Sequence, residues 1–469
     1  MVRLSPGGGF KAAGEGVIDT ERAVLDPVSE VKESGLQVPR LADGTELIGE
    51  YQGSGFREPK YIIRRSDGQV IQLPHLLFLL AGSIDGHRSV QQVTTRLSQE
   101  FGRDLDVDQV AFLLDNRLRP AGILAVSPDA PAGTGQPTAM RSDPLLSLRF
   151  RVGVVPESVA WVVAGIFQFF FFPPVLLAAL ALFVVLDVAL VLRGGFGQLE
   201  SSALAIVHQP TLTLLVLAML LISAAFHECG HVAACRYGGA RPGRMGFGIY
   251  LVWPALYSTV TDAYRLSRRG RLRTDLGGVY FNVVFIAAMS LAYLESEGPA
   301  WLLIAIAMMH IETVRQFIPF IRLDGYYILS DLIGVPDLFS RMGPVLKSII
   351  PRREPHPRVQ ELKPWVRRVV TLWVILVIPA LIYFLLPFLI LAPRVLPVVW
   401  DAFGQRGPQF IDALHAGELA IAAVGLIQMF LLVLPWAGAA LIFGMMGRRL
   451  VRVVRTRWRR GRPGARRSP

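Results

Sequence analysis

Residues 211–235 read TLTLLVLAMLLISAAFHECGHVAAC, an apolar run that carries no charge before His227. As an α-helix, this run is long enough to cross a hydrocarbon core of roughly 30 Å. The four-residue spacing places His227 and His231 on one face of that helix, one turn apart. Two imidazoles in this arrangement can bind one Zn²⁺, and the adjacent Glu228 can act as a general base. The stretch therefore predicts a membrane-spanning helix with a metal site near its end.

The same H-E-x-x-H pattern also occurs by chance on the solvated helix faces of soluble proteins. Here the pattern lies in an apolar span, where ionisable groups are costly and mark functional sites. This setting favours the metal site. The chain has only two cysteines, Cys229 and Cys235, both on this helix. They exclude a disulfide framework, and we interpret both as packing residues.

Composition predicts a mainly α, polytopic membrane protein with soluble flanks. The chain has 469 residues, of which 52% are hydrophobic and 18% charged, and its mean hydropathy is +0.45. We expect an interfacial or re-entrant piece at 158–172 and about six transmembrane helices. These lie at 175–193, 211–235, 276–294, 300–320, 369–391 and 419–446.

Basic residues predict the orientation of these spans. The segments 236–275 and 321–368 are rich in arginine, and ten arginines without an acidic residue follow from Arg448 onward. We therefore expect both termini on the cytoplasmic side of the membrane. The basic tail, 448–469, is expected to touch anionic lipid, with nucleic-acid binding as the alternative.

The residues before the membrane region predict a disordered segment, 1–45, with no cleavable signal peptide, and a small α+β domain, 46–126. Within that domain, 61–63 and 70–73 flank an Asp-Gly turn and predict a hairpin. Ser89 and Asp106 each begin an amphipathic helix, and 123–126 reads as a closing strand. The pattern is typical of a winged helix-turn-helix. A linker at 127–156 then leads to the membrane domain, 157–447.

The string LAGSIDGHRSV at 80–90, leading into the next helix, resembles the PqqD-like domain. The resemblance implies a domain that binds a leader peptide as an added strand. DNA binding is the commonest use of a winged helix, but nine basic residues face eight acidic ones across 57–119. This near-equal charge predicts no strongly positive surface for nucleic acid, so we expect a peptide partner and no nucleic acid. A purely structural cap remains the other interpretation.

A catalytic zinc site needs three protein ligands and one open position. Asp324 lies in the string FIRLDGYYILSDL at 320–332, just after the fourth expected span. It should therefore reach the same depth as the two histidines. Gly325 allows the chain to turn and approach closely.

His227–His231 together with Leu323-Asp324-Gly325 resembles the site-2 protease family of intramembrane zinc metalloproteases. The string at 320–332 is similar to a bacterial branch of peptide zinc metalloproteases, whose members often carry a PqqD-like domain. The resemblance implies Zn²⁺ bound by His227, His231 and Asp324, with Glu228 as the base. It also implies a bacterial inner-membrane location.

The family carries a Gly-Pro-x-x-Asn-like element in the span after the catalytic helix. Here this element reads GGVYFN at 277–282, without the proline and one residue longer. Asn282 therefore has two interpretations, a substrate-binding or oxyanion role and an interhelical hydrogen bond. Both stay open.

Four other ionisable residues have no assigned role. Glu312 is expected to pair with Arg315 at i, i+3, while His310 is too far along its span to share the metal of Asp324. Asp187 has no partner that the sequence identifies. Asp262 echoes a loop of the family.

The sequence thus predicts an intramembrane zinc metalloendopeptidase that hydrolyses a membrane-associated peptide or protein in the lipid bilayer, with the N-terminal domain recruiting the peptide. The alternative is a peptide export protein, or an export accessory protein, with a non-catalytic zinc site. The balanced charge of 57–119 disfavours a membrane-tethered transcription regulator.

Overall fold

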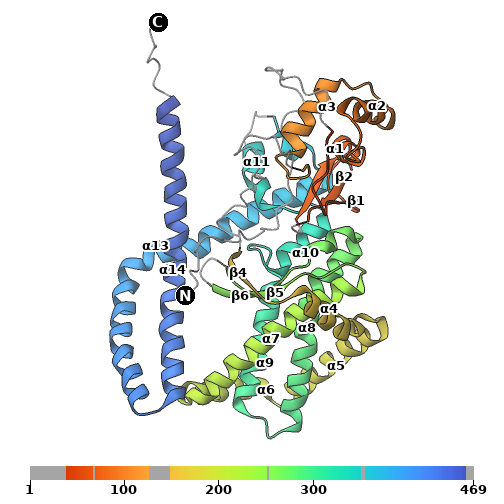
Figure 1. Cartoon of the computed structure of the whole chain (residues 1–469). Helices are drawn as coiled ribbons and strands as arrows, with labels where there is room; N and C mark the ends of the chain where they lie inside the picture. The colour runs from red at the N-terminus through yellow and green to blue at the C-terminus, as the bar shows by residue number, and fades with distance from the viewer. Residues whose placement is uncertain (1–37, 67–68, 126–147, 251–252, 350–353, 461–469) are drawn as a thin grey trace, which may run out of the picture.

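The computed structural model describes residues 38–66, 69–125, 148–250, 253–349 and 354–460. It is mostly helical, with a small α+β unit at the N-terminal end, a helical body and two long helices beside that body (Figure 1). Within the described residues, five helices are long and apolar enough to cross a membrane. The expected mainly α architecture is confirmed, and the five apolar helices fit a membrane-embedded protein.

The N-terminal unit contains one antiparallel sheet of order β1-β2-β3. Its strands are β1 (Glu46–Glu50), β2 (Lys60–Arg64) and β3 (Val70–Pro74). The antiparallel β2–β3 pairing confirms the two strands of the predicted hairpin, whose Asp67-Gly68 turn lies outside the described residues. One face of the sheet packs on the helices of the unit, and the opposite face, with Ile62 and Val70, packs against Tyr51 and Tyr264. The sheet therefore lies between its own helices and the helical body.

Two of the three α-helices of the N-terminal unit begin at the capping residues that predict them. The first is α1 (His75–Gly82), and Ser89 caps α2 (Val90–Phe101) with a capping box. Asp106 forms the same motif at α3 (Val107–Leu113), which continues as a π-helical turn to Leu118.

The expected closing strand is a single bridge from Leu124 to Leu41, and Val126 lies outside the described residues. Leu41 of this bridge belongs to the segment 1–45, which was expected to be disordered. Residues 1–37 of that segment lie outside the described residues. The winged helix-turn-helix remains a prediction.

A second antiparallel sheet has the strand order β4-β5-β6 and lies beside the helix that carries His227 and His231. Its strands are β4 (Leu148–Val155), β5 (Met245–Tyr250) and β6 (Trp253–Ser258). The end of the expected linker, 127–156, is therefore a strand, because 148–155 pairs with β5. The part of the linker at 127–147 lies outside the described residues.

The helical body follows the expected order, with different boundaries. It comprises α4 (Glu157–Phe167) with a 3₁₀ turn to Phe171, α5 (Pro173–Leu192), α6 (Gly195–His208), α7 (Pro210–Tyr237), α8 (Arg268–Glu295), α9 (Ala300–Gln316), α10 (Asp324–Ile333), α11 (Phe339–Ile349) and α12 (Pro357–Gln360). Helix α6 occupies a stretch expected to be a loop.

The fourth expected span, 300–320, corresponds to α9, whose 17 residues extend about 25 Å. That length is at the lower limit of the roughly 17–25 residues that a transmembrane helix needs. Its residues Leu302, Leu303 and Met309 are buried against neighbouring helices. Other apolar residues of α9, such as Ile311 and Val314, are exposed, so α9 as a sixth span stays a prediction beside the five longer candidate spans of the described residues.

The last two helices are longer than expected. Helix α13 (Pro364–His415) is one helix of 52 residues, where a span at 369–391 and a loop were expected. It contains five internal prolines and changes direction along its length (Figure 1). Helix α14 (Leu419–Arg460) continues into the expected basic tail, of which 461–469 lie outside the described residues.

Two glycines allow α7, which carries His227 and His231, to lie directly against α8. A Cβ on Gly230 of α7 would overlap the carbonyl oxygen of Gly277, and a Cβ on Gly277 would lie 2.5 Å from the carbonyl oxygen of Gly230. Small residues of this kind allow two helix backbones to touch. The crossing presses the histidine face of α7 onto α8.

Candidate metal centre

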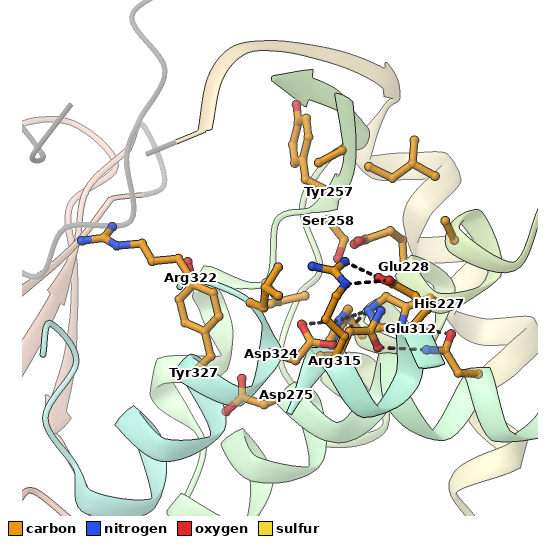
Figure 2. A pocket seen from close by; sticks show the side chains of 18 of the residues that line it. His227, Glu228, Tyr257, Ser258, Asp275, Glu312, Arg315, Arg322, Asp324 and Tyr327 are labelled. Carbon is orange, nitrogen blue, oxygen red and sulfur yellow. Dashed lines mark hydrogen bonds and ion pairs between the residues drawn. The ribbon is translucent and has the colours of Figure 1, made fainter. Parts of the chain in front are cut away.

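Three predicted ligands converge in the structure. The ligand atoms of His227, His231 and Asp324 all lie within 4.8 Å of one another. The two histidine Nε2 atoms are 3.1 Å apart. Asp324 Oδ2 lies 3.1 Å from His227 Nε2, and Asp324 Oδ1 lies 3.5 Å from His231 Nε2. Both histidines are buried, and Figure 2 shows His227 and Asp324 facing each other.

The other nitrogen of each imidazole contacts α8. Nδ1 of His231 lies 2.8 Å from the backbone carbonyl oxygen of Thr274, which can only accept a hydrogen bond. Nδ1 of His227 lies 3.2 Å from Oδ1 of Asn282, whose Nδ2 donates to Gln316 Oε1 on α9. Each Nδ1 therefore carries the proton, and each Nε2 directs a lone pair toward Asp324.

This arrangement fits a cation. Two imidazole lone pairs and a carboxylate face one another, and Asp324 Oδ2 is buried without a hydrogen-bond donor. Zinc ligands at roughly 2.0–2.1 Å in a tetrahedron lie about 3.3–3.4 Å apart. The observed separations of 3.1–3.5 Å are close to this value. Gly278 leaves the space open, because a Cβ there would overlap Nε2 of both histidines.

Electrostatics favours the ionised form of the third ligand. Burial opposes ionisation of Asp324, but in the metal-free site His231 and His227, when protonated, outweigh it and hold the pKa of this carboxyl group below its ordinary value. Asp324 is the first residue of α10, where the helix N-terminus also stabilises negative charge.

Glu228 lies beside the ligands on the wall of a cavity of about 1140 Å³. The half-buried Glu228 and the three ligands share this cavity with residues of β6, α8 and α9. Figure 2 shows Tyr257 and Ser258 of β6 near the site. It also shows the predicted Glu312–Arg315 pair, whose Glu312 Oε2 accepts from Arg315 Nε at 2.7 Å. A substrate in this cavity would reach both the ligands and the candidate base.

Asn282 forms interhelical hydrogen bonds, which is the second of its two interpretations. Its side-chain oxygen orients His227, while its amide reaches Gln316. Sequence reasoning missed the contributions of Thr274 and Gln316. Thr274 acts through its backbone carbonyl, so no side-chain signal could have revealed it.

Two other acidic residues have partners that the sequence did not identify. Asp187 Oδ2 lies 3.0 Å from His310 Nε2, which joins α5 to α9 away from the three ligands. The buried Asp262 accepts from Arg64 Nη1 of β2 at 2.7 Å and from the backbone N–H of Arg241 at 2.8 Å. Asp262 thus connects the N-terminal unit to the helical body.

Comparison with known proteins gives one distant relationship. No family model and no solved structure matches this chain. A protein of Bacillus subtilis (strain 168), named "Putative peptide zinc metalloprotease protein YydH", is 23% identical over 145 residues. The match covers 31% of this chain and 57% of the relative, so it spans little more than half of the relative's length. This distant homology suggests a peptidase or a related function.

Proposed function

We propose that this protein is an intramembrane zinc metalloendopeptidase of the site-2 protease type. The observation that carries the proposal is the convergence of His227, His231 and Asp324, with both Nδ1 atoms tied back to α8 and Glu228 on the cavity wall. A structural site needs no neighbouring base and no cavity, whereas a catalytic site needs both. The name of the distant relative supports the same chemistry.

The residues divide the work of peptide hydrolysis. His227, His231 and Asp324 would hold a zinc ion, which supplies an activated water and polarises the scissile carbonyl group. Glu228 takes the proton from the attacking water and returns it to the leaving amine. Asn282 and the Thr274 carbonyl keep the two imidazoles in the metal-binding tautomer.

The remaining parts of the proposal concern substrate and location. The substrate is a membrane-associated peptide or protein, because the cavity lies among helices apolar enough to span a bilayer. The N-terminal unit is a PqqD-like domain that recruits the peptide. The membrane is the bacterial inner membrane, with the N-terminal unit in the cytoplasm.

Replacing Glu228 with glutamine tests the mechanism. Glu228→Gln should retain about one zinc per chain, since the ligands are untouched, and lose cleavage by about 10²–10⁴-fold, the usual contribution of a general base. Zinc is measured by elemental analysis, and cleavage by mass spectrometry of a peptide library added to proteoliposomes. Glu200→Gln, at an exposed position on α6, is the matched control and should behave as wild type.

Wild-type turnover by Glu228→Gln would remove this residue from the mechanism. His227→Ala and Asp324→Ala, in contrast to Glu228→Gln, should lose the zinc. Zinc-loaded wild type that moves peptides into vesicles without cutting them would favour the export alternative.

A further inference from the structure

Helix α10 connects the metal centre to the N-terminal unit. It begins with Asp324, and Asp331 follows seven residues later. Seven residues are nearly two helical turns, so both carboxyl groups lie on the same face of α10. Asp324 faces the histidines of α7, while Asp331 faces Arg271 at the start of α8.

A buried cluster holds Asp331 in place. The Tyr51 hydroxyl and the Arg271 Nε both donate to Asp331 Oδ1, each at 3.1 Å. Arg271 also donates from Nη2 to the backbone carbonyl of Gln52 at 3.0 Å, and its guanidinium lies 4.2 Å from the centre of the Tyr51 ring. Tyr51 is 0% exposed and Arg271 is 1% exposed. The N-terminal unit therefore supplies one of the partners of this carboxyl group.

The segment 51–55, which contains Tyr51 and Gln52, covers the C-terminal end of α10. The Gly55 N–H donates to the Gly334 carbonyl at 2.9 Å. Gly334 caps α10 with φ +72°, and a Cβ there would overlap the Gly53 carbonyl. A Cβ on Gly55 would overlap the Ile333 carbonyl. Backbone meets backbone at this end of the helix, so α10 and the segment 51–55 cannot shift independently.

Helix α8 extends the connection to the histidines. Arg271 lies about one turn before Thr274, whose carbonyl accepts from His231. The side chain that holds Asp331 and the backbone that orients His231 are therefore on one helix. A ten-residue helix such as α10 has little stability of its own and depends on tertiary contacts for its position.

We propose that docking of segment 51–55 sets the position of α10 and so places Asp324 for the metal. Tyr51 and Asp331 are positioning residues, which act on the third ligand through α10. The inference rests on the proposed function for the identity of the metal, and it adds that the N-terminal unit controls the metal centre. Because coupling is reciprocal, a ligand of this unit that changed metal affinity by a given factor would have its own affinity changed by the same factor when the metal binds.

The test measures zinc affinity in full-length protein purified in detergent. Tyr51→Phe removes one hydroxyl group, and Asp331→Asn removes a charge that Arg271 holds. Each variant should bind zinc about tenfold more weakly, the lower end of the effect of residues that orient metal ligands. Affinity is measured by competition with a chromophoric chelator. In the cobalt-substituted protein, the visible absorption should lose intensity, because the site becomes less tetrahedral.

Tyr61→Phe is the matched control. Tyr61 lies on β2 of the same unit, where its ring stacks on His75 and Phe78 at 4.8 Å between ring centres. This variant should keep wild-type affinity and the wild-type cobalt spectrum. The thermal unfolding of every variant is followed in parallel, so that a change of affinity is read only in folded protein.

Wild-type zinc affinity and a wild-type cobalt spectrum in both Tyr51→Phe and Asp331→Asn would overturn the inference and leave the proposed function standing. Absence of zinc from folded wild type would remove the proposed function, and this inference with it. If wild type binds zinc but cleaves no peptide, and both variants bind zinc more weakly, the inference is supported although the peptidase activity fails.

Discussion

At the scale of single residues, Gly278 decides whether an ion has room between the histidines. Its position on α8 faces Nε2 of both His227 and His231, the atoms left free when each Nδ1 is hydrogen-bonded. A methyl group at this position would occupy the space that the three ligand atoms surround. Neither imidazole could turn away without losing its own hydrogen bond.

We therefore expect Gly278→Ala to weaken zinc binding by about ten- to hundredfold, because over-packing costs about 1–3 kcal/mol. The measurement is zinc content after equilibration with a graded series of chelators. Gly197→Ala on α6 is the control, since a Cβ there meets nothing within 4 Å. Tight zinc binding by Gly278→Ala would mean that the metal does not occupy the space between these imidazoles.

At the scale of elements, the sequence predicted those features that depend on local pattern. The apolar run and the four-residue spacing of His227 and His231 lie on one helix, so periodicity alone could reveal them. The proline-rich α13 was divided wrongly, because prolines usually end helices and here only bend one. The Asp187–His310 pair joins helices 123 residues apart in sequence, a pairing that no local pattern encodes.

Helix α8 shows what else local pattern could not reveal. Its residues Arg271, Thr274, Gly278 and Asn282 recur at helical spacing on one face. Arg271 contacts Asp331, and the other three contact the two histidines. Only Asn282 was noticed, through a family motif. The others act through a backbone carbonyl, a missing side chain and a contact with Tyr51, so their roles require the tertiary structure.

Docking of the N-terminal unit is also a contact between elements, and Asp262 contributes to it. This side chain is 5% exposed and receives Arg64 Nη1 at 2.7 Å and Arg265 Nε at 3.1 Å. Asp262→Ala should weaken docking by about 2 kcal/mol, or about thirtyfold, because it removes the buried partner of Arg64, the guanidinium group that reaches Asp262 from the N-terminal unit. This free energy is set below that of a fully buried ion pair, because the Arg64 side chain is 30% exposed. Hydrogen exchange across 51–57 and 239–244 should become faster.

Asp108→Ala, at an exposed position in the first turn of α3, is the control and should leave exchange in both segments unchanged. Equal exchange in Asp262→Ala and wild type would show that Asp262 does not contribute to docking and that other contacts, such as Arg265 Nη2 to Glu46 Oε1 at 2.7 Å, hold the unit to the body.

At the scale of the whole molecule, α8 separates two ends of different charge. Its 28 residues extend about 42 Å. Four arginines lie in its first six residues beside the N-terminal unit, whereas the connection to α9 at 296–299 has one acidic and no basic residue. The N-terminal unit and the C-terminal part of α14 lie on the same side of the helical body (Figure 1). Basic residues stay in the cytoplasm, so the N-terminal unit should be cytoplasmic.

Single cysteines in the α8–α9 connection and in the N-terminal unit test this orientation in intact spheroplasts. Glu297→Cys, in the exposed α8–α9 connection, should react with a membrane-impermeant maleimide. Gln99→Cys, exposed on α2, should react only after lysis. Wild type corrects for Cys229, which is partly buried, and Cys235, which is buried. The reverse pattern would place the N-terminal unit outside, and a leader peptide made in the cytoplasm would then have to cross the membrane before this unit could recruit it.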